Sequence, residues 1–215
     1  MKYLKIWKEN RRNLLAPILC LIWNESVFYG ARILTKNRQH YVLTSGIDER
    51  IPLVTWTIAI YLICFLVWAL TYVYIACGDR KEAKIFFRAD IIGKTIALLL
   101  YLLMPTTMLR PEITGNGVWD ILMRFLYRID APDNLFPSIH CMVSWFCWIG
   151  MRKRKEDCSP FFRYGTLVFS LAVCVSTLTT KQHVLADVFG GILTAELAYW
   201  ISKKMAIPGK REKGE

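Results

Sequence analysis

The stretch from Pro52 to Cys77, PLVTWTIAIYLICFLVWALTYVYIAC, contains no charged residue over 26 positions. A helix needs about 20 predominantly apolar residues to cross the hydrocarbon core of a bilayer, and this segment exceeds that length. Hydrophobic residues also make up 54% of the 215-residue chain, which is above the range usual for soluble domains. The sequence therefore predicts an integral membrane protein.

Further apolar segments lie on both sides of this stretch. Together with it they give six predicted membrane spans, at residues 14–34, 52–77, 85–104, 139–151, 164–180 and 184–201. A chain of this length is ample for one domain and short for two. We therefore expect an all-α fold, a polytopic bundle of six transmembrane helices that forms a single membrane domain over residues 1–215.

The net charge of +11 is distributed in blocks rather than evenly. A soluble protein with this balance would be a candidate for nucleic-acid binding, but basic blocks between apolar runs are typical of membrane topology and of contact with anionic lipids. Most basic residues fall in residues 2–12, 80–88, 152–163 and 203–213, which six spans place on one side. We therefore expect a multi-pass protein of the cell membrane with both termini in the cytoplasm. Its expected partner is the lipid bilayer, and no nucleic acid is expected.

The longest connection, residues 105–137, is predicted on the outer side of the membrane. Long loops in compact proteins are usually functional or disordered. Within it, residues 118–129 place large apolar side chains at helical spacing. This pattern predicts an amphipathic helix that lies flat at the membrane interface.

Two of the three histidines stand at span ends on the predicted outer side. His183 opens the last span and Asp187 follows four residues later, so the two side chains share one face of a helix. A carboxylate there would fix the tautomer of the imidazole and leave the other ring nitrogen as a nucleophile or base. A polar pair at a span end is the alternative, but a carboxylate inside the apolar run VLADVFGGIL is costly and usually has a task.

His140 lies in the segment NLFPSIH, at the predicted start of the fourth span. Pro137 suits the first helical position, the N–H groups after it are free, and Ser138 adds a hydroxyl. Such a helix N-terminus suits phosphate, although an ordinary proline-started span fits equally well. Other candidates for phosphate binding are cations and hydroxyls, namely Arg110, Ser176, Thr177 and Lys181. A Ser/Thr-rich helix end with a snorkelling lysine is the alternative.

In order and spacing, these residues resemble the type 2 phosphatidic acid phosphatase family. The family pattern has three parts: Lys-x6-Arg-Pro, Pro-Ser-x-His and Ser-Arg-x5-His-x3-Asp. Residues 137–140 match the second part in full, and residues 176–187 match the third in spacing, with Thr177 in place of the arginine. Of the first part the chain keeps Arg110 and its proline, while Leu103 replaces the lysine. The resemblance implies a catalytic core over residues 105–187.

The resemblance implies a metal-independent mechanism without a cofactor. His183 would attack phosphorus and form a phosphohistidine, Asp187 would orient it, and His140 would protonate the leaving alkoxide and then activate the acceptor. Arg110, Ser138 and nearby backbone N–H groups would hold the phosphate oxygens. Each missing cation removes roughly a few kcal/mol of transition-state stabilisation, and Lys181 is the candidate replacement. No metal-ligand cluster is visible, and the seven cysteines include no C-x-x-C.

These features predict a membrane phosphatase that hydrolyses a lipid phosphate ester of the phosphatidate, phosphatidylglycerophosphate or polyprenyl diphosphate type, with its active site on the outer face. A headgroup phosphotransferase of the inositol phosphorylceramide or sphingomyelin synthase type would share the chemistry up to the phosphohistidine and differ in the acceptor. A non-catalytic lipid-binding or transport protein is a further alternative. The loss of two basic motif residues favours it, and the intact histidines with Asp187 argue against it.

Overall fold

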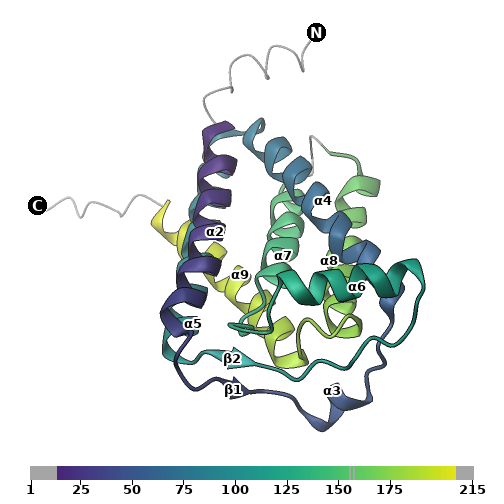
Figure 1. Cartoon of the computed structure of the whole chain (residues 1–215). Helices are drawn as coiled ribbons and strands as arrows, with labels where there is room; N and C mark the ends of the chain where they lie inside the picture. The colour runs from purple at the N-terminus through teal and green to yellow at the C-terminus, as the bar shows by residue number, and fades with distance from the viewer. Residues whose placement is uncertain (1–13, 155, 157, 207–215) are drawn as a thin grey trace, which may run out of the picture.

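The computed structural model describes residues 14–154, 156 and 158–206 and is mainly helical (Figure 1). The basic residues 2–12 and 210–213, which support part of the predicted topology, lie outside the described residues. The long helices are α2 (Leu15–Thr35), α4 (Ile58–Ala76), α5 (Arg80–Leu103), α7 (Ile139–Arg152), α8 (Pro160–Thr179) and α9 (Leu185–Met205). The shorter elements are β1 (Tyr41–Val42), α3 (Gly46–Arg50), η2 (Thr55–Thr57), β2 (Thr106–Thr107) and α6 (Val118–Ile129). The predicted helical fold class is confirmed.

The six long helices fall on the six predicted spans and differ from them at their ends. α5 begins at Arg80 rather than at residue 85, because the side chain of Asp79 caps it by accepting the N–H groups of the second and third residues, both at 2.9 Å. α4 begins at Ile58 rather than at residue 52. The 3-10 helix η2 leads directly into it, and Val54, just before η2, is extended and donates its N–H to the carbonyl of Thr179 at 2.9 Å.

Within the described residues, two helical segments, Thr55–Ala76 and Pro160–Thr179, are long and apolar enough to cross a membrane by length and composition. α7 has 14 residues, fewer than the roughly 20 that a span requires. α5 carries charged residues at both its start and its middle. The arrangement of six membrane spans therefore remains a prediction.

An ion pair in the middle of α5 ties three helices together. Lys94 Nζ lies 2.7 Å from the carboxylate of Asp90 and 3.1 Å from the carbonyl oxygen of Cys20 on α2. The hydroxyl of Tyr72 on α4 donates to the other carboxylate oxygen at 2.6 Å. Both charged side chains are buried. Asp90 and Lys94 are four residues apart on a helix, a separation at which oppositely charged side chains commonly pair.

A close approach of α9 to the start of α7 brings the two histidine segments together. A Cβ atom at Gly191 would lie 2.5 Å from the carbonyl oxygen of Ser138, so a glycine is required at this contact. The N–H of Ser138 donates to the carbonyl of Asp187 at 3.0 Å. His140, two residues after Ser138, is thereby fixed relative to His183.

α6 lies across the bundle, in a direction different from that of α2 and α7 (Figure 1). It has the bounds predicted for the amphipathic helix, 118–129. Met123 and Leu126 are buried, whereas Ile121 and Phe125 are exposed. The exposed apolar side chains are those that a helix at a membrane interface would bury in lipid, and that placement remains a prediction.

Candidate active site

His183 occupies the turn between α8 and α9. The backbone N–H groups of Gln182 and His183 both donate to the carbonyl of Thr177, at 2.9 and 3.1 Å, and this holds the turn against the end of α8. Asp187, on the first turn of α9, brings one carboxylate oxygen to His183 Nδ1 at 3.2 Å and to the N–H of Val184 at 3.0 Å. Both His183 and Asp187 are buried. The contact predicted from their spacing is present.

The carboxylate of Asp187 changes the acid–base behaviour of His183. Burial lowers the pKa of His183, but the hydrogen bond to Asp187 and the nearby negative charge, chiefly that of Asp187, raise it, and the net result is a raised pKa. A neutral imidazole that donates from Nδ1 to the carboxylate keeps its lone pair on Nε2. This tautomer, assigned from the hydrogen bond, makes Nε2 the nucleophilic nitrogen.

His140 stands on the first turn of α7, with its ring centroid 6.0 Å from that of His183. Side chains of α4 surround it: its ring stacks on Tyr61 at 4.4 Å and lies 5.7 Å from Phe65 and 5.5 Å from Trp68. Its Nε2 atom is buried and has no hydrogen-bond partner among the described residues. Leaving such a group unpaired is costly, and a polar ligand that bonded this nitrogen would remove that cost.

Both histidines line one cavity of about 330 Å³. Three further lining residues also have a buried polar side-chain atom without a partner in the described part of the chain: Oδ1 of Asn24, Oδ1 of Asp133 and Nε2 of Gln182. Buried polar groups in folded proteins are hydrogen-bonded in the large majority of cases. The cavity is therefore suited to a ligand that supplies polar partners.

Arg110 lies directly behind this cavity. Its guanidinium donates to the carbonyl of Asp130 and to the side-chain oxygen of Gln182, and it stacks over the ring of Tyr127 at 4.7 Å. Gln182 lines the cavity, whereas Arg110 does not. One hydrogen-bonded side chain therefore separates the arginine from the space beside His183.

Residues 38–201 match the family model described as the PAP2 superfamily. The chain belongs to the PAP2 superfamily. The resemblance drawn from the motifs is thus confirmed, and no curated protein matches the chain in addition. PAP2 superfamily members are generally phosphoric ester hydrolases, so membership indicates phosphatase or phosphotransferase chemistry.

Lys181, the candidate replacement for the missing PAP2 cations, points away from the histidines. Its backbone has a φ of 52°, a left-handed conformation that redirects the chain between α8 and α9. Its ammonium donates to the carbonyl oxygen of Asp48 on α3 at 2.9 Å, and it does not line the histidine cavity. In this structure Lys181 therefore anchors α3.

The three predicted hydroxyl residues are buried, and two of them are occupied by local bonds. Ser138 caps α7 by accepting the N–H of Cys141 at 3.2 Å. Thr177 donates to the carbonyl of Cys174 at 2.8 Å. Ser176 Oγ has no partner among the described residues, so it is able to form a new hydrogen bond.

The sequence analysis did not single out Gln182 or Asp130 as site residues. Asp130 accepts a hydrogen bond from the hydroxyl of Tyr61 at 3.4 Å and receives Arg110 at its carbonyl. The available signal for Gln182 was its position next to His183. The aromatic residues around His140 carried no sequence signal of a site, because aromatic side chains are common in membrane spans.

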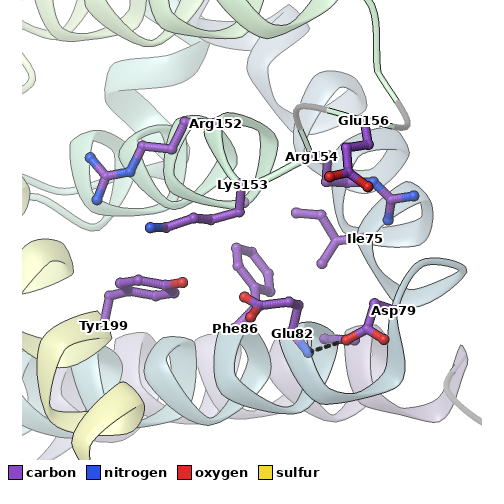
Figure 2. A pocket seen from close by; sticks show the side chains of 11 residues that line it. Ile75, Asp79, Glu82, Phe86, Arg152, Lys153, Arg154, Glu156 and Tyr199 are labelled. Atoms are coloured by element: carbon purple, nitrogen blue, oxygen red, sulfur yellow. Dashed lines mark hydrogen bonds between the residues drawn. The ribbon is translucent and has the colours of Figure 1, made fainter.

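A larger cavity, of about 440 Å³, lies at the opposite end of α7 (Figure 2). Arg152 and Lys153 extend over it near Tyr199, and Arg152 is paired with Glu196 at 2.8 Å. His140 lies on the first turn of α7, and Arg152 is its last residue. Because a 14-residue helix rises about 1.5 Å per residue, the two cavities are about 20 Å apart along α7. The described lining of the larger cavity includes no histidine, so the candidate active site is the smaller one.

Proposed function

We propose that this protein is an integral membrane enzyme that cleaves a lipid phosphate ester through a phosphohistidine. The observation that carries the proposal is the pair of histidines on one cavity, with His183 oriented by the buried carboxylate of Asp187. Nε2 of His183 attacks phosphorus, the bond from phosphorus to the alcohol oxygen breaks, and His140 supplies that oxygen with a proton. The acceptor then gives its proton to His140 and takes the phosphoryl group from His183.

With water as the acceptor, the protein is a metal-independent lipid phosphatase. Transfer to a lipid alcohol is the second candidate, and one observation favours it. A cavity of about 370 Å³ adjoins the histidine cavity and shares Asn24, Glu25, Phe65 and Trp68 with it. Most of its other lining residues are apolar side chains of α2 and α4, so it offers space for a lipid tail beside the reacting phosphate.

The proposal includes an active site on the outer face and cytoplasmic termini. The histidine cavity and the basic residues Arg152 and Lys153 lie at opposite ends of α7. Cytoplasmic segments of membrane proteins carry the excess of basic residues. This distribution supports an outward-facing site.

The test uses detergent-purified full-length protein in mixed micelles with a panel of phosphomonoester and phosphodiester lipids. Release of the lipid alcohol and of the phosphorylated product is measured with EDTA present. We expect at least one lipid to be converted, and His183→Ala to lower the rate by roughly a thousandfold or more because it removes the nucleophile. His40→Ala is the matched control, since His40 bonds the carbonyl of Arg38 and lies outside the cavity.

Conversion that survives in His183→Ala would exclude the phosphohistidine mechanism. Addition of a lipid alcohol distinguishes the two acceptors, because a transferase forms a new phosphoester lipid and a phosphatase does not. If neither wild type nor the control converts any lipid, a non-catalytic lipid-binding or transport role is favoured.

A further inference from the structure

The histidine cavity carries little positive charge for a phosphate site. Among the described residues that line it none is Lys or Arg, whereas Glu25, Asp130 and Asp133 contribute carboxylates. Leu103 and Thr177 stand where the PAP2 motif has cations. A phosphate monoester carries about two negative charges at neutral pH, and carboxylates nearby would repel it. The cavity is therefore poorly matched to such a group.

Glu25 and Asp133, two of these acidic residues, differ in their ion pairing. Asp133 pairs with Arg32 at 3.0 Å. Glu25 accepts a hydrogen bond from the side chain of Asn24 at 3.2 Å, and no ion pair to it is found in the described part of the chain. It lies on α2 within a predicted membrane span, where a carboxylate without a cationic partner is costly. A positively charged ligand group would supply that partner.

The rest of the cavity wall is largely aromatic. Its six aromatic side chains are Phe28, Tyr29, Tyr61, Phe65, Trp68 and Tyr101. The faces of aromatic rings attract cations, and aromatic cages are a common way to bind quaternary ammonium groups. Three of these rings, on α4, surround His140. An ammonium bound against them would lie beside the reacting phosphate.

A metal ion is a poorer match for these carboxylates. In the described residues no three His, Cys, Asp or Glu side chains are grouped closely enough to hold a metal. An organic ammonium spreads its charge and can be held by ring faces and a carboxylate together. Burial raises the pKa of both Asp130 and Asp133, and a cation in the cavity would offset that cost of keeping them charged.

We propose that the site takes a phosphodiester lipid whose headgroup carries an ammonium group, with the phosphate at His183 and the ammonium between Glu25 and the aromatic side chains of α4. Such a headgroup pairs one negative with one positive charge, so it needs fewer cations than a phosphomonoester or a diphosphate. The inference rests on the proposed function for the role of His183, and it narrows the substrate class of that site.

The test is a binding measurement on full-length His183→Ala protein in a nonionic detergent, by isothermal titration calorimetry. Three probes share one alkyl chain: dodecylphosphocholine, dodecyl methyl phosphate and dodecyl phosphate. The second has the phosphodiester without the ammonium, and the third has the extra negative charge. We expect dodecylphosphocholine to bind about tenfold more tightly than dodecyl methyl phosphate, the effect of a desolvated cation–π contact, and dodecyl phosphate to bind most weakly.

The added substitution Glu25→Gln should remove most of the preference for dodecylphosphocholine over dodecyl methyl phosphate. Glu112→Gln is the matched control, because Glu112 is exposed and lies outside the cavity, and it should leave the preference unchanged. Equal binding of these two probes, or a preference that survives Glu25→Gln, would overturn the inference. Because His183→Ala prevents turnover, the binding result does not depend on catalysis. An intact preference in a protein that cleaves no lipid would refute the proposed function alone.

Discussion

Asp187→Asn is expected to remove one charge from the active site and little else. Oδ2 of Asp187 accepts hydrogen bonds from both His183 Nδ1 and the N–H of Val184, while Oδ1 is buried without a partner among the described residues. An asparagine with its carbonyl oxygen in the place of Oδ2 keeps both bonds. Its amide nitrogen then occupies the position that now has no partner. The variant therefore isolates the effect of the charge on His183.

The size of the effect follows from the two kinds of hydrogen bond. A bond to a charged group contributes about 1.5–3 kcal/mol, and a neutral one contributes about 0.5–1.5 kcal/mol. Loss of the charge then costs about 1–1.5 kcal/mol, or about tenfold in rate. Asp187→Ala also removes both bonds and leaves the His183 Nδ1 and Val184 N–H groups unpaired, at about 1–3 kcal/mol each. We expect the alanine variant to lose at least ten times more activity than the asparagine variant.

The assay is kcat/KM against pH for the best lipid of the panel. Burial lowers the pKa of His183, whereas the hydrogen bond to Asp187 and the charge of Asp187 raise it, and the net result is a raised pKa. Attack requires an unprotonated Nε2, so wild-type activity falls as the pH drops through that raised pKa. Asparagine removes the raising charge and leaves the burial, so the acidic limb moves to lower pH. The reasoning would be refuted if wild type and Asp187→Asn had their acidic limbs at the same pH. It would also be refuted if Asp187→Asn and Asp187→Ala lost equal activity.

Two further predictions concern packing. Asp90→Asn leaves Lys94 buried without its counter-charge and should lower the free energy of unfolding by about 3–5 kcal/mol. A double variant, Asp90→Leu with Lys94→Met, should melt nearer to wild type, and equal Tm values for the single and double variants would contradict this. Gly191→Ala places a Cβ atom 2.5 Å from the carbonyl of Ser138 and should lower both Tm and activity. Gly165→Ala, whose Cβ would meet nothing within 4 Å, should leave both unchanged.

The features that sequence predicted well are local ones. The helices follow from long apolar runs, and α6 follows from apolar side chains at helical spacing with no long-range information. The contacts of His183 with Asp187 and of Lys94 with Asp90 each join residues one helical turn apart. Such features depend on spacing along the chain, which the sequence displays directly.

The features that sequence did not predict join distant segments. Arg110 reaches Gln182, and Lys181 reaches the carbonyl of Asp48, across 72 and 133 positions. Arg32 likewise pairs with Asp133. In each case the fold, and not the spacing along the chain, brings the two residues together. A motif can therefore identify the residues of a site. The groups with which each basic side chain pairs or forms hydrogen bonds are determined by tertiary packing.

The altered PAP2 motif has a different meaning once those partners are known. On sequence alone, the loss of two cations points to weakened catalysis or to replacement by Lys181. In the structure Lys181 is bound to the carbonyl of Asp48, and the described lining of the cavity contains Glu25 and aromatic rings but no Lys or Arg. The histidines and Asp187 lie close together, as the proposed phosphoryl transfer requires. We infer that the substitutions changed the charge of the ester that the site accepts, while the residues proposed to attack phosphorus were kept.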